Sequence, residues 1–235
     1  PAIAESGDPL GREIGQALWP EAKPIEFLEQ QRKAMGDYNF AALFQGNPSP
    51  REGAMLKVNC LIEPPAGEAD LSVLAFDLAS SEVTGDWTAA AFWEKVGDRL
   101  RLTLFRVKKS TEDRNQWMRR LAETLNPTRI AFPQDPGSAG KDVKRMLERL
   151  FQGFAYESEL PVGSKVYRVE PMASSIESGI VGLIKNEYYD DAIESFRQFP
   201  NGTHDDFEDA AATGHKVLMR IAGTSVYDNF FGITG

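Results

Sequence analysis

The order of strand-like and helix-like stretches constrains the fold of this chain more than any other feature of the sequence. Three stretches in a row, LSVLAFDLAS (71–80), WTAAAFWEKV (87–96) and RLRLTLFRVKK (99–109), are rich in the residues that strands prefer. Gly97 and Asp98 form a turn signal between the last two stretches. The three stretches therefore predict an antiparallel meander.

Alternating helix and strand patterns follow the meander. TEDRNQWMRRLAETLN (111–126) and SAGKDVKRMLERLFQG (138–153) have helical periodicity, and RIAFPQD (129–135) between them has the pattern of a short buried strand. For residues 154–186 we expect a strand, an irregular stretch, a short helix and a hairpin at GIVGLIKN (179–186), before a last helix that starts near residue 205. The whole order predicts an α/β protein with a mixed central sheet, antiparallel in its first three strands and then parallel, flanked by helices.

Residues 1–67 differ from the rest of the chain. They contain prolines at positions 20, 24, 48, 50, 64 and 65 around one helical stretch, IEFLEQQRKAMG (25–36). We interpret residues 1–67 as an extended, partly helical lead-in. Residues 68–235 are predicted to form the folded domain.

Composition limits the possible chemistry. The single cysteine, Cys60, and the two histidines, His204 and His215, exclude a disulfide framework, a multi-cysteine zinc site and a histidine-rich site. Any bound metal must therefore be a hard cation that is held by oxygen ligands. The chain has neither an apolar run of membrane-spanning length nor the apolar core of a signal peptide, so we expect a cytoplasmic location and no membrane partner.

Four carboxylates crowd the start of the last helix, in GTHDDFEDAA (202–211). Asp205 as the N-cap and Glu208 three residues later have the spacing of a capping box, with Glu208 pointing away from the core. Asp206 borders the apolar stripe of the helix and Asp209 lies next to it; the stripe consists of Phe207, Ala210, Ala211, Gly214, Val217, Leu218 and Ile221. Two acids beside a buried seam repel each other unless a cation lies between them, and a divalent metal would serve.

Two further acids are candidates for the same site. Asp77 lies within the apolar strand VLAFDLA, where an uncompensated charge is costly, and Asp135 follows the strand RIAFPQ. Alternatives are an ion pair of Asp77 with Arg106 or Arg129, and a turn at Asp135-Pro-Gly. Ligands gather at the carboxyl ends of parallel strands, so we expect the acids to converge there. Such carboxylates commonly hold two Mg²⁺ or Mn²⁺ ions for phosphodiester hydrolysis, and the predicted catalytic and metal-binding residues are Asp77, Asp135, Asp206 and Asp209.

Basic residues near these acids are candidate phosphate contacts. Lys141 and Arg145 form a basic ridge with Arg149 just after Asp135, and Lys165 and Arg168 lie in GSKVYRVEP (163–171). The alternatives are a solvated helix face for the first group and structural ion pairs for the second. We predict that Lys141, Arg145, Lys165 and Arg168 contact DNA.

Five motifs in this order resemble one known family over most of the chain. They are FQGNPSPREG (44–53), FDLASS (76–81), PQDPGSAGK (133–141), GSKVYRVEPMASSIESGIVGL (163–183) and FPNGTHDDFEDA (199–210), of which the last is the most specific. Together they resemble the C-terminal nuclease domain of the large terminase subunit of tailed bacteriophages, the DNA-packaging motor, whose fold is RNase H-like.

The resemblance implies a function and a set of partners. It implies a metal-dependent endonuclease that cuts concatemeric double-stranded viral DNA in the host cytoplasm, with Asp77, Asp135 and Asp209 as metal ligands and Asp206 beside them. Asp86 matches the family's next acid only loosely. It also implies that residues 1–67 are a tether from an upstream ATPase domain, and that the portal protein and the small terminase subunit are partners in the full motor.

Two other functions remain open from the sequence. A Holliday-junction resolvase or a ribonuclease H has the same carboxylate arrangement, although the long proline-rich lead-in favours a terminase. A non-catalytic module that docks DNA or a portal protein is the second alternative. The net charge of −9 predicts that DNA affinity of this chain alone is weak.

Overall fold

The computed structural model describes residues 1–46, 55–78, 87–133, 138–159 and 163–223. The chain divides into two compact units, one built mainly from residues 1–54 and the other spanning Met55–Ser225. Residues 55–67, which the sequence places in the lead-in, supply Met55 and Leu56 to the core of the second unit. The role of the lead-in as a tether stays a prediction.

The first unit contains one long helix and a small core. Helix α1, Ile25–Leu43, starts directly after Pro24, a residue whose restricted backbone suits a helix start. The core of the first unit consists of Ile3, Ala17, Leu28 and Phe40.

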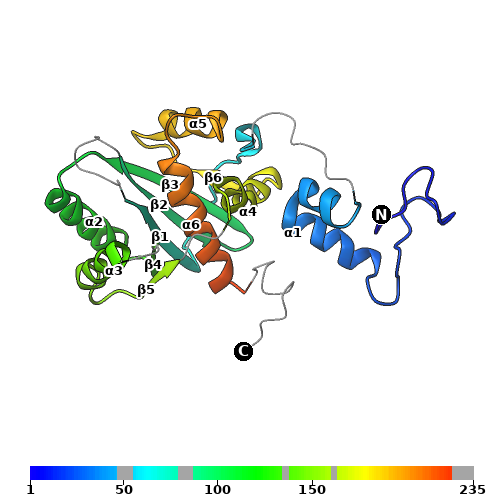
Figure 1. The fold of residues 1–235 in the computed structure, drawn as a ribbon, viewed down its shortest axis with the longest axis horizontal. Coiled ribbons are helices and arrows are strands. Elements are labelled where there is room, and N and C mark those ends of the chain that lie inside the picture. Colours follow the sequence, from blue (N-terminus) through cyan, green and yellow to red (C-terminus); the bar gives the residue numbers. More distant parts are fainter. Residues whose placement is uncertain (47–54, 79–86, 134–137, 160–162, 224–235) are drawn as a thin grey trace. The chain divides into compact units, whose positions relative to one another are not determined.

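The second unit is built on a six-stranded mixed sheet (Figure 1). Strands β1 (Leu71–Asp77), β2 (Thr88–Val96) and β3 (Arg99–Val107) form the predicted antiparallel meander. The other strands are β4 (Arg129–Pro133), β5 (Tyr156–Glu159) and β6 (Val181–Leu183). Strand β4 pairs in parallel with β1, β5 with β4, and β6 with β3, so the order across the whole sheet is β5-β4-β1-β2-β3-β6. The predicted mixed sheet, antiparallel in its first three strands and parallel in the others, is confirmed.

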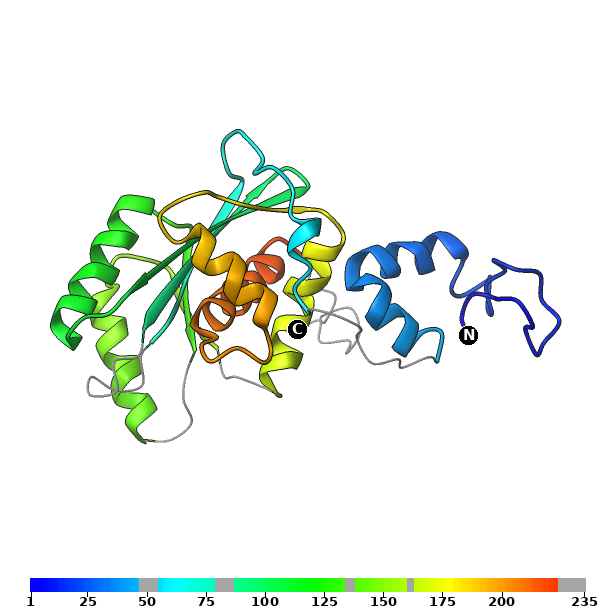
Figure 2. The ribbon, with the colours of Figure 1, turned by 90° about the horizontal axis from the view of Figure 1, so that it is seen from above.

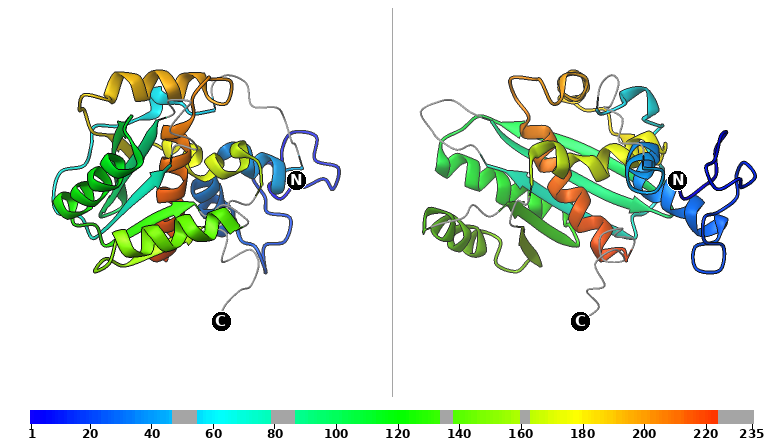
Figure 3. Two further views of the ribbon diagram at one scale, coloured as in Figure 1. Left: turned by 60° about the vertical axis from the view of Figure 1, so that its left-hand side comes forward. Right: turned by 45° about the vertical axis from the view of Figure 1, so that its right-hand side comes forward.

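Helices cover both faces of this sheet (Figures 2 and 3). Helices α2 (Thr111–Leu125) and α3 (Ser138–Leu150) lie on one face, and α4 (Lys165–Glu177), α5 (Tyr189–Gln198) and α6 (Asp206–Ile221) lie on the other. A short 3₁₀ turn, η1 (Val58–Cys60), precedes β1. No helix in the described parts of the chain is long and apolar enough to cross a bilayer.

One local prediction between β5 and α6 is wrong. The stretch GIVGLIKN is not a hairpin, because Val181–Leu183 forms a single edge strand that pairs in parallel with β3. The short helix expected in this region is α4, which Ser164 caps by accepting a hydrogen bond from the backbone N–H of Tyr167. Helix α5 was not predicted, although Ala192 and Phe196 have helical spacing and are both buried.

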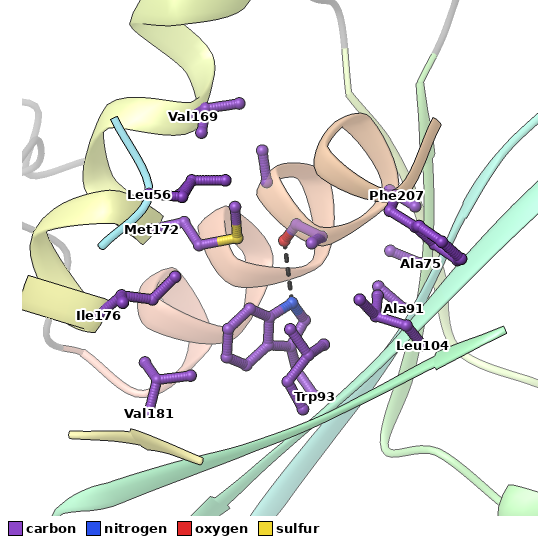
Figure 4. Packing of buried hydrophobic residues seen from close by; sticks show 14 of the residues in the cluster. Leu56, Ala75, Ala91, Trp93, Leu104, Val169, Met172, Ile176, Val181 and Phe207 are labelled. Carbon is purple, nitrogen blue, oxygen red and sulfur yellow. Dashed lines mark hydrogen bonds between the residues drawn. The ribbon is translucent and has the colours of Figure 1, made fainter. Parts of the chain in front are cut away.

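Small residues let α6 pack closely against the sheet. The indole Nε1 of Trp93 donates a 2.9 Å hydrogen bond to the carbonyl of Ala211, as Figure 4 shows. A Cβ on Gly214 would lie 2.7 Å from Cδ1 of Trp93 and 3.0 Å from Cβ of Ala75. The middle of α6 is therefore held closely against β1 and β2.

Candidate active site

Asp77 ends β1 and faces α6. Val73 and Ala75 are buried in the same cluster as α6, so strand alternation directs the Asp77 side chain to that face. Burial, followed by the charges of Asp209 and Asp206, raises the pKa of Asp77 to about 8 against an opposing effect of Lys165. An acid in these surroundings favours protonation unless additional positive charge arrives.

Arg106 and Arg129, which were considered as ion-pair partners of Asp77, pair with other carboxylates. Arg106 pairs with Asp191 of α5, and Arg129 pairs with Glu157 of β5. Neither arginine is therefore the ion-pair partner expected for Asp77, which instead lies near the carboxylates of Asp206 and Asp209.

Asp205 and Glu208 do not form the predicted capping box. Asp205 is the N-cap residue, but its side chain makes no capping hydrogen bond and instead accepts one of 2.5 Å from Nζ of Lys165. Glu208 is fully buried, and Oγ of Ser195 lies 2.8 and 3.0 Å from its two carboxylate oxygens. Burial raises the pKa of Glu208 to about 7, with a smaller lowering by the Ser195 hydrogen bond. The prediction failed because α5 covers the side of α6 that the sequence pattern left to solvent.

Asp209 is the most enclosed of the predicted site acids that the structure describes, with 9% of its surface exposed. Its Oδ2 lies 3.2 Å from Nζ of Lys165, and its Oδ1 lies 3.0 Å from Nη2 of Arg168. The Arg168 contact has ion-pair distance without hydrogen-bond geometry, so Oδ1 is a buried acceptor with no hydrogen bond from any described residue. Asp206, three residues earlier, is half-buried, and its negative charge helps to raise the pKa of Asp77.

Arg106, which the sequence suggested only as a possible ion-pair partner of Asp77, is a further residue of this region. The sheet register aligns Asp77 with Ala89 and Ala89 with Arg106, so the three form one row across β1, β2 and β3. The Arg106 guanidinium lies 4.3 Å from the ring of Trp87 and 5.2 Å from the ring of Phe207 in the first turn of α6. Arg106 thus ties β3 and α5 to the turn that carries the acids. The meander register was the signal that could have found it.

Asp135 and Asp86 lie outside the described residues. Strand β4, which pairs in parallel with β1, ends at Pro133, two residues before Asp135 in the sequence. Within the described ranges, no three Asp, Glu, His or Cys side chains are arranged to hold a metal ion. The described residues supply Asp77, Asp206 and Asp209, whose hard oxygen donors and crowded charge suit a divalent cation.

The predicted basic residues fall into two groups. Lys141 and Arg145 are exposed near the start of α3, and Arg145 lies 3.7 Å from Asp142. Lys165 and Arg168 instead face the acids of α6. DNA contact by all four residues stays a prediction.

The two histidines are separate from the acids in their chemistry. His215 is buried beside Trp93, and its Nε2 lies 2.9 Å from Oγ of Ser175. Burial lowers the pKa of His215 to about 4, so its ring is neutral and structural near pH 7. His204 is exposed before α6.

The fold and the acids at the β1–α6 junction define an RNase H-like domain, and comparison with known proteins gives its family. A protein-family model described as Terminase RNaseH-like domain matches residues 74–217. The chain therefore belongs to this family. A search of curated protein sequences gives no significant match.

Solved structures of large terminases share the fold. The large terminase nuclease from thermophilic phage G20c with bound zinc has a TM-score of 0.52 and 16% identity, covering 68% of this chain and 96% of that one. The same nuclease with bound magnesium has a TM-score of 0.52 and 15% identity, covering 71% and 98%. A large terminase from another thermophilic bacteriophage, solved in complex with ADP, has a TM-score of 0.59 and 8% identity, covering 82% of this chain and 52% of that one.

Proposed function

We propose that this chain is the nuclease domain of a phage large terminase and hydrolyses phosphodiester bonds of double-stranded DNA. The observation that carries the proposal is the position of Asp77, which ends β1 opposite the acidic first turn of α6 and has a pKa raised to about 8 by burial and like charge. A fold keeps such a destabilising cluster where its function needs it. Membership of the Terminase RNaseH-like domain family supports the same assignment.

Two divalent cations, Mg²⁺ or Mn²⁺, are the proposed cofactors. Asp77, Asp206 and Asp209 would hold them, together with Asp135. The G20c nuclease was solved with zinc and with magnesium, which supports a divalent metal in this family. When bound, such ions lower the pKa of a water nucleophile and stabilise charge on the phosphate.

The residues around the acids have positioning roles in this proposal. Glu208 joins α6 to Ser195 of α5, and Arg106 stacks on Phe207 and pairs with Asp191. Both interactions fix the first turn of α6, on which Asp206 and Asp209 lie. Asp209 and Asp77 would thus be held in place before metal and DNA arrive, which lowers the cost of ordering the site.

DNA binding would depend partly on other parts of a larger assembly. Lys141, Arg145, Lys165 and Arg168 are the proposed phosphate contacts, and the net charge of −9 makes weak affinity the expectation for this chain alone. The large terminase that was solved with ADP is a longer protein, of which this chain covers 52%. We propose an upstream ATPase domain, a portal protein and a small terminase subunit as partners that bring DNA to the acids.

A plasmid-nicking assay tests this function. We expect the wild-type protein to nick supercoiled plasmid with Mn²⁺ or Mg²⁺ and to lose this activity in EDTA, and Asp209→Asn to be inactive under all conditions. Asp98→Asn, which removes an exposed charge in the β2–β3 turn, is the matched control and should nick like the wild type. Metal-independent nicking, or a fully active Asp209→Asn protein, would contradict the assignment.

A further inference from the structure

The first turn of α4 directs two cations at the acids of α6. Lys165 is the first residue of α4, and Arg168 follows three residues later on the same side of the helix. Lys165 Nζ lies 2.5 Å from Asp205 Oδ2 and 3.2 Å from Asp209 Oδ2. Asp209, one of the acids predicted to bind metal, is therefore already paired with a cation that the protein itself supplies.

The two cations differ in how tightly they are held. The Arg168 side chain is 22% exposed and approaches Asp209 without a hydrogen bond, whereas the Lys165 side chain is 50% exposed and hydrogen-bonds to Asp205. A half-exposed lysine on a four-carbon stem can move its ammonium group several ångströms at little cost. Of the two cations, Lys165 is therefore the one that can leave its carboxylate partners with less rearrangement.

Lys165 keeps its charge in this position. Burial alone would lower the pKa of Lys165, but the hydrogen bond to Asp205 and the charge of Asp209 outweigh burial and raise it. Two positive charges, those of Lys165 and Arg168, face at least three carboxylates here, and Oδ1 of Asp209 remains a buried acceptor without a hydrogen bond from the described residues. A dication at Asp209 would compensate the charge more fully and would repel the ammonium group.

We propose that Lys165 is a built-in counter-ion that occupies Asp205 and Asp209 in the metal-free domain, competes with divalent metal for them, and is released toward DNA phosphate when metal binds. This inference rests on the proposed function, because it assumes that the acids bind metal. It adds a coupling between metal and DNA through one side chain. By linkage, DNA that captures the released Lys165 tightens metal binding by the same factor as metal tightens DNA binding.

Metal binding without DNA gives the first test. Isothermal titration with Mn²⁺ should show a dissociation constant about 2- to 5-fold lower for Lys165→Gln than for the wild type, since a partly exposed competing charge is removed. Lys57→Gln is the matched control, because Lys57 also forms an ion pair with a glutamate of α4, has a similar 42% exposure, and its removal changes the net charge equally. Lys57→Gln should bind Mn²⁺ like the wild type. Asp209→Asn should abolish the heat and so assign it to this site.

DNA binding gives the second test. Fluorescence anisotropy of a labelled duplex of about 20 base pairs, measured in EDTA and in Ca²⁺, should show that metal tightens DNA binding several-fold in the wild type and much less in Lys165→Gln. If the wild type binds Mn²⁺ and Lys165→Gln binds it no more tightly, the competition is wrong and the nuclease proposal stands. If neither protein binds Mn²⁺, the proposed metal site fails, and the counter-ion role fails with it.

Discussion

The two faces of the central sheet are packed by different kinds of residue. The face under α2 and α3 is filled by large apolar side chains, among them Leu74, Phe76, Phe132, Met118 and Phe151. The face under α4, α5 and α6 combines Trp93, Leu102 and Leu104 with small sheet residues such as Ala75, Ala89, Ala91 and Ala131, and its helices bury Glu208, Asp209 and His215.

The difference shows how the fold separates stability from chemistry. Gly214 and the alanines let α6 approach the sheet closely, and the acids of its first turn act on Asp77. The polar groups buried on this face reduce stability unless they are paired. The face under α2 and α3, here called the aromatic face, buries large apolar side chains, so we interpret it as the stabilising half of the domain. The face under α4, α5 and α6 is here called the acidic face.

The largest effect should come from a change on the acidic face. We expect Asp77→Asn to reduce plasmid cleavage by about 1000-fold or more, because a metal ligand is lost. The same change should raise the free energy of unfolding in EDTA, since it removes a half-buried acid that like charges surround. Nicking rates and chemical denaturation measure the two effects. Wild-type nicking, or a destabilised Asp77→Asn protein, would contradict our interpretation of this face.

On the aromatic face we expect the opposite result. Phe151 is fully buried and stacks on Phe76 with 5.5 Å between ring centroids, so Phe151→Ala should lower the free energy of unfolding by about 3 to 5 kcal/mol. Cleavage per folded molecule should stay within about two-fold of the wild type at a temperature where the variant is folded. A selective loss of cleavage in a fully folded Phe151→Ala protein would show that the two faces are not separable.

Gly214 tests the close approach of α6. Gly214→Ala places a methyl group 2.7 Å from Trp93 and should cost about 1 to 3 kcal/mol of stability, despite the better helix propensity of alanine. Because α6 must shift, cleavage by the folded variant should also fall. Thr213→Ala, one residue earlier and only partly buried, is the control and should change neither. A stabilised Gly214→Ala protein would mean that α6 is not held by this contact.

The acidic face should also make stability depend on pH. The pKa of Asp77 rises from 3.8 to about 8 and that of Glu208 from 4.5 to about 7, so the folded state binds protons more tightly than the unfolded state. Stability in EDTA should therefore fall as pH rises, by about 2 kcal/mol between pH 6.5 and 8. Glu208→Gln should reduce this slope and Asp77→Asn should remove most of it.

The low pKa of His215 acts in the opposite direction at lower pH. Because burial lowers the pKa of His215 from 6.5 to about 4, its contribution to stability is lost as pH falls through this range. Between pH 6.5 and 8 this opposing effect is small, because the unfolded ring is at most half protonated there. A slope that is unchanged in Asp77→Asn would show that the acid does not carry the pH dependence.

The smallest effect should come from the exposed ridge of α3. Arg145→Ala should weaken DNA binding a few-fold for all sequences alike and change the free energy of unfolding by no more than about 0.5 kcal/mol, because its side chain is 73% exposed. Arg149→Ala, one turn further from the end of β4, should have a weaker effect on binding. Anisotropy with two duplexes of unrelated sequence measures both. A loss confined to one duplex would point to base recognition instead.

The sequence by itself determined the antiparallel meander and the side of α6 that packs on the core. Strand-forming stretches predicted the meander, and the spacing of Phe207, Ala210, Gly214 and Val217 predicted the buried stripe; all four are buried. Position 77 was recognisable because a charge within an apolar strand conflicts with its surroundings. These features are local, since strand alternation and helix periodicity record which side of one element meets the core.

Only the tertiary structure decided the second layer and the pairing of charges. Glu208 lies on the side of α6 away from the sheet, and only the packing of α5 shows that this side is buried too. The contact of Lys165 with Asp209 joins residues 44 positions apart, and the row from Asp77 to Arg106 needs the register of three strands. Periodicity cannot report such contacts, because they depend on how separate elements meet in space and each element's own pattern is compatible with several arrangements.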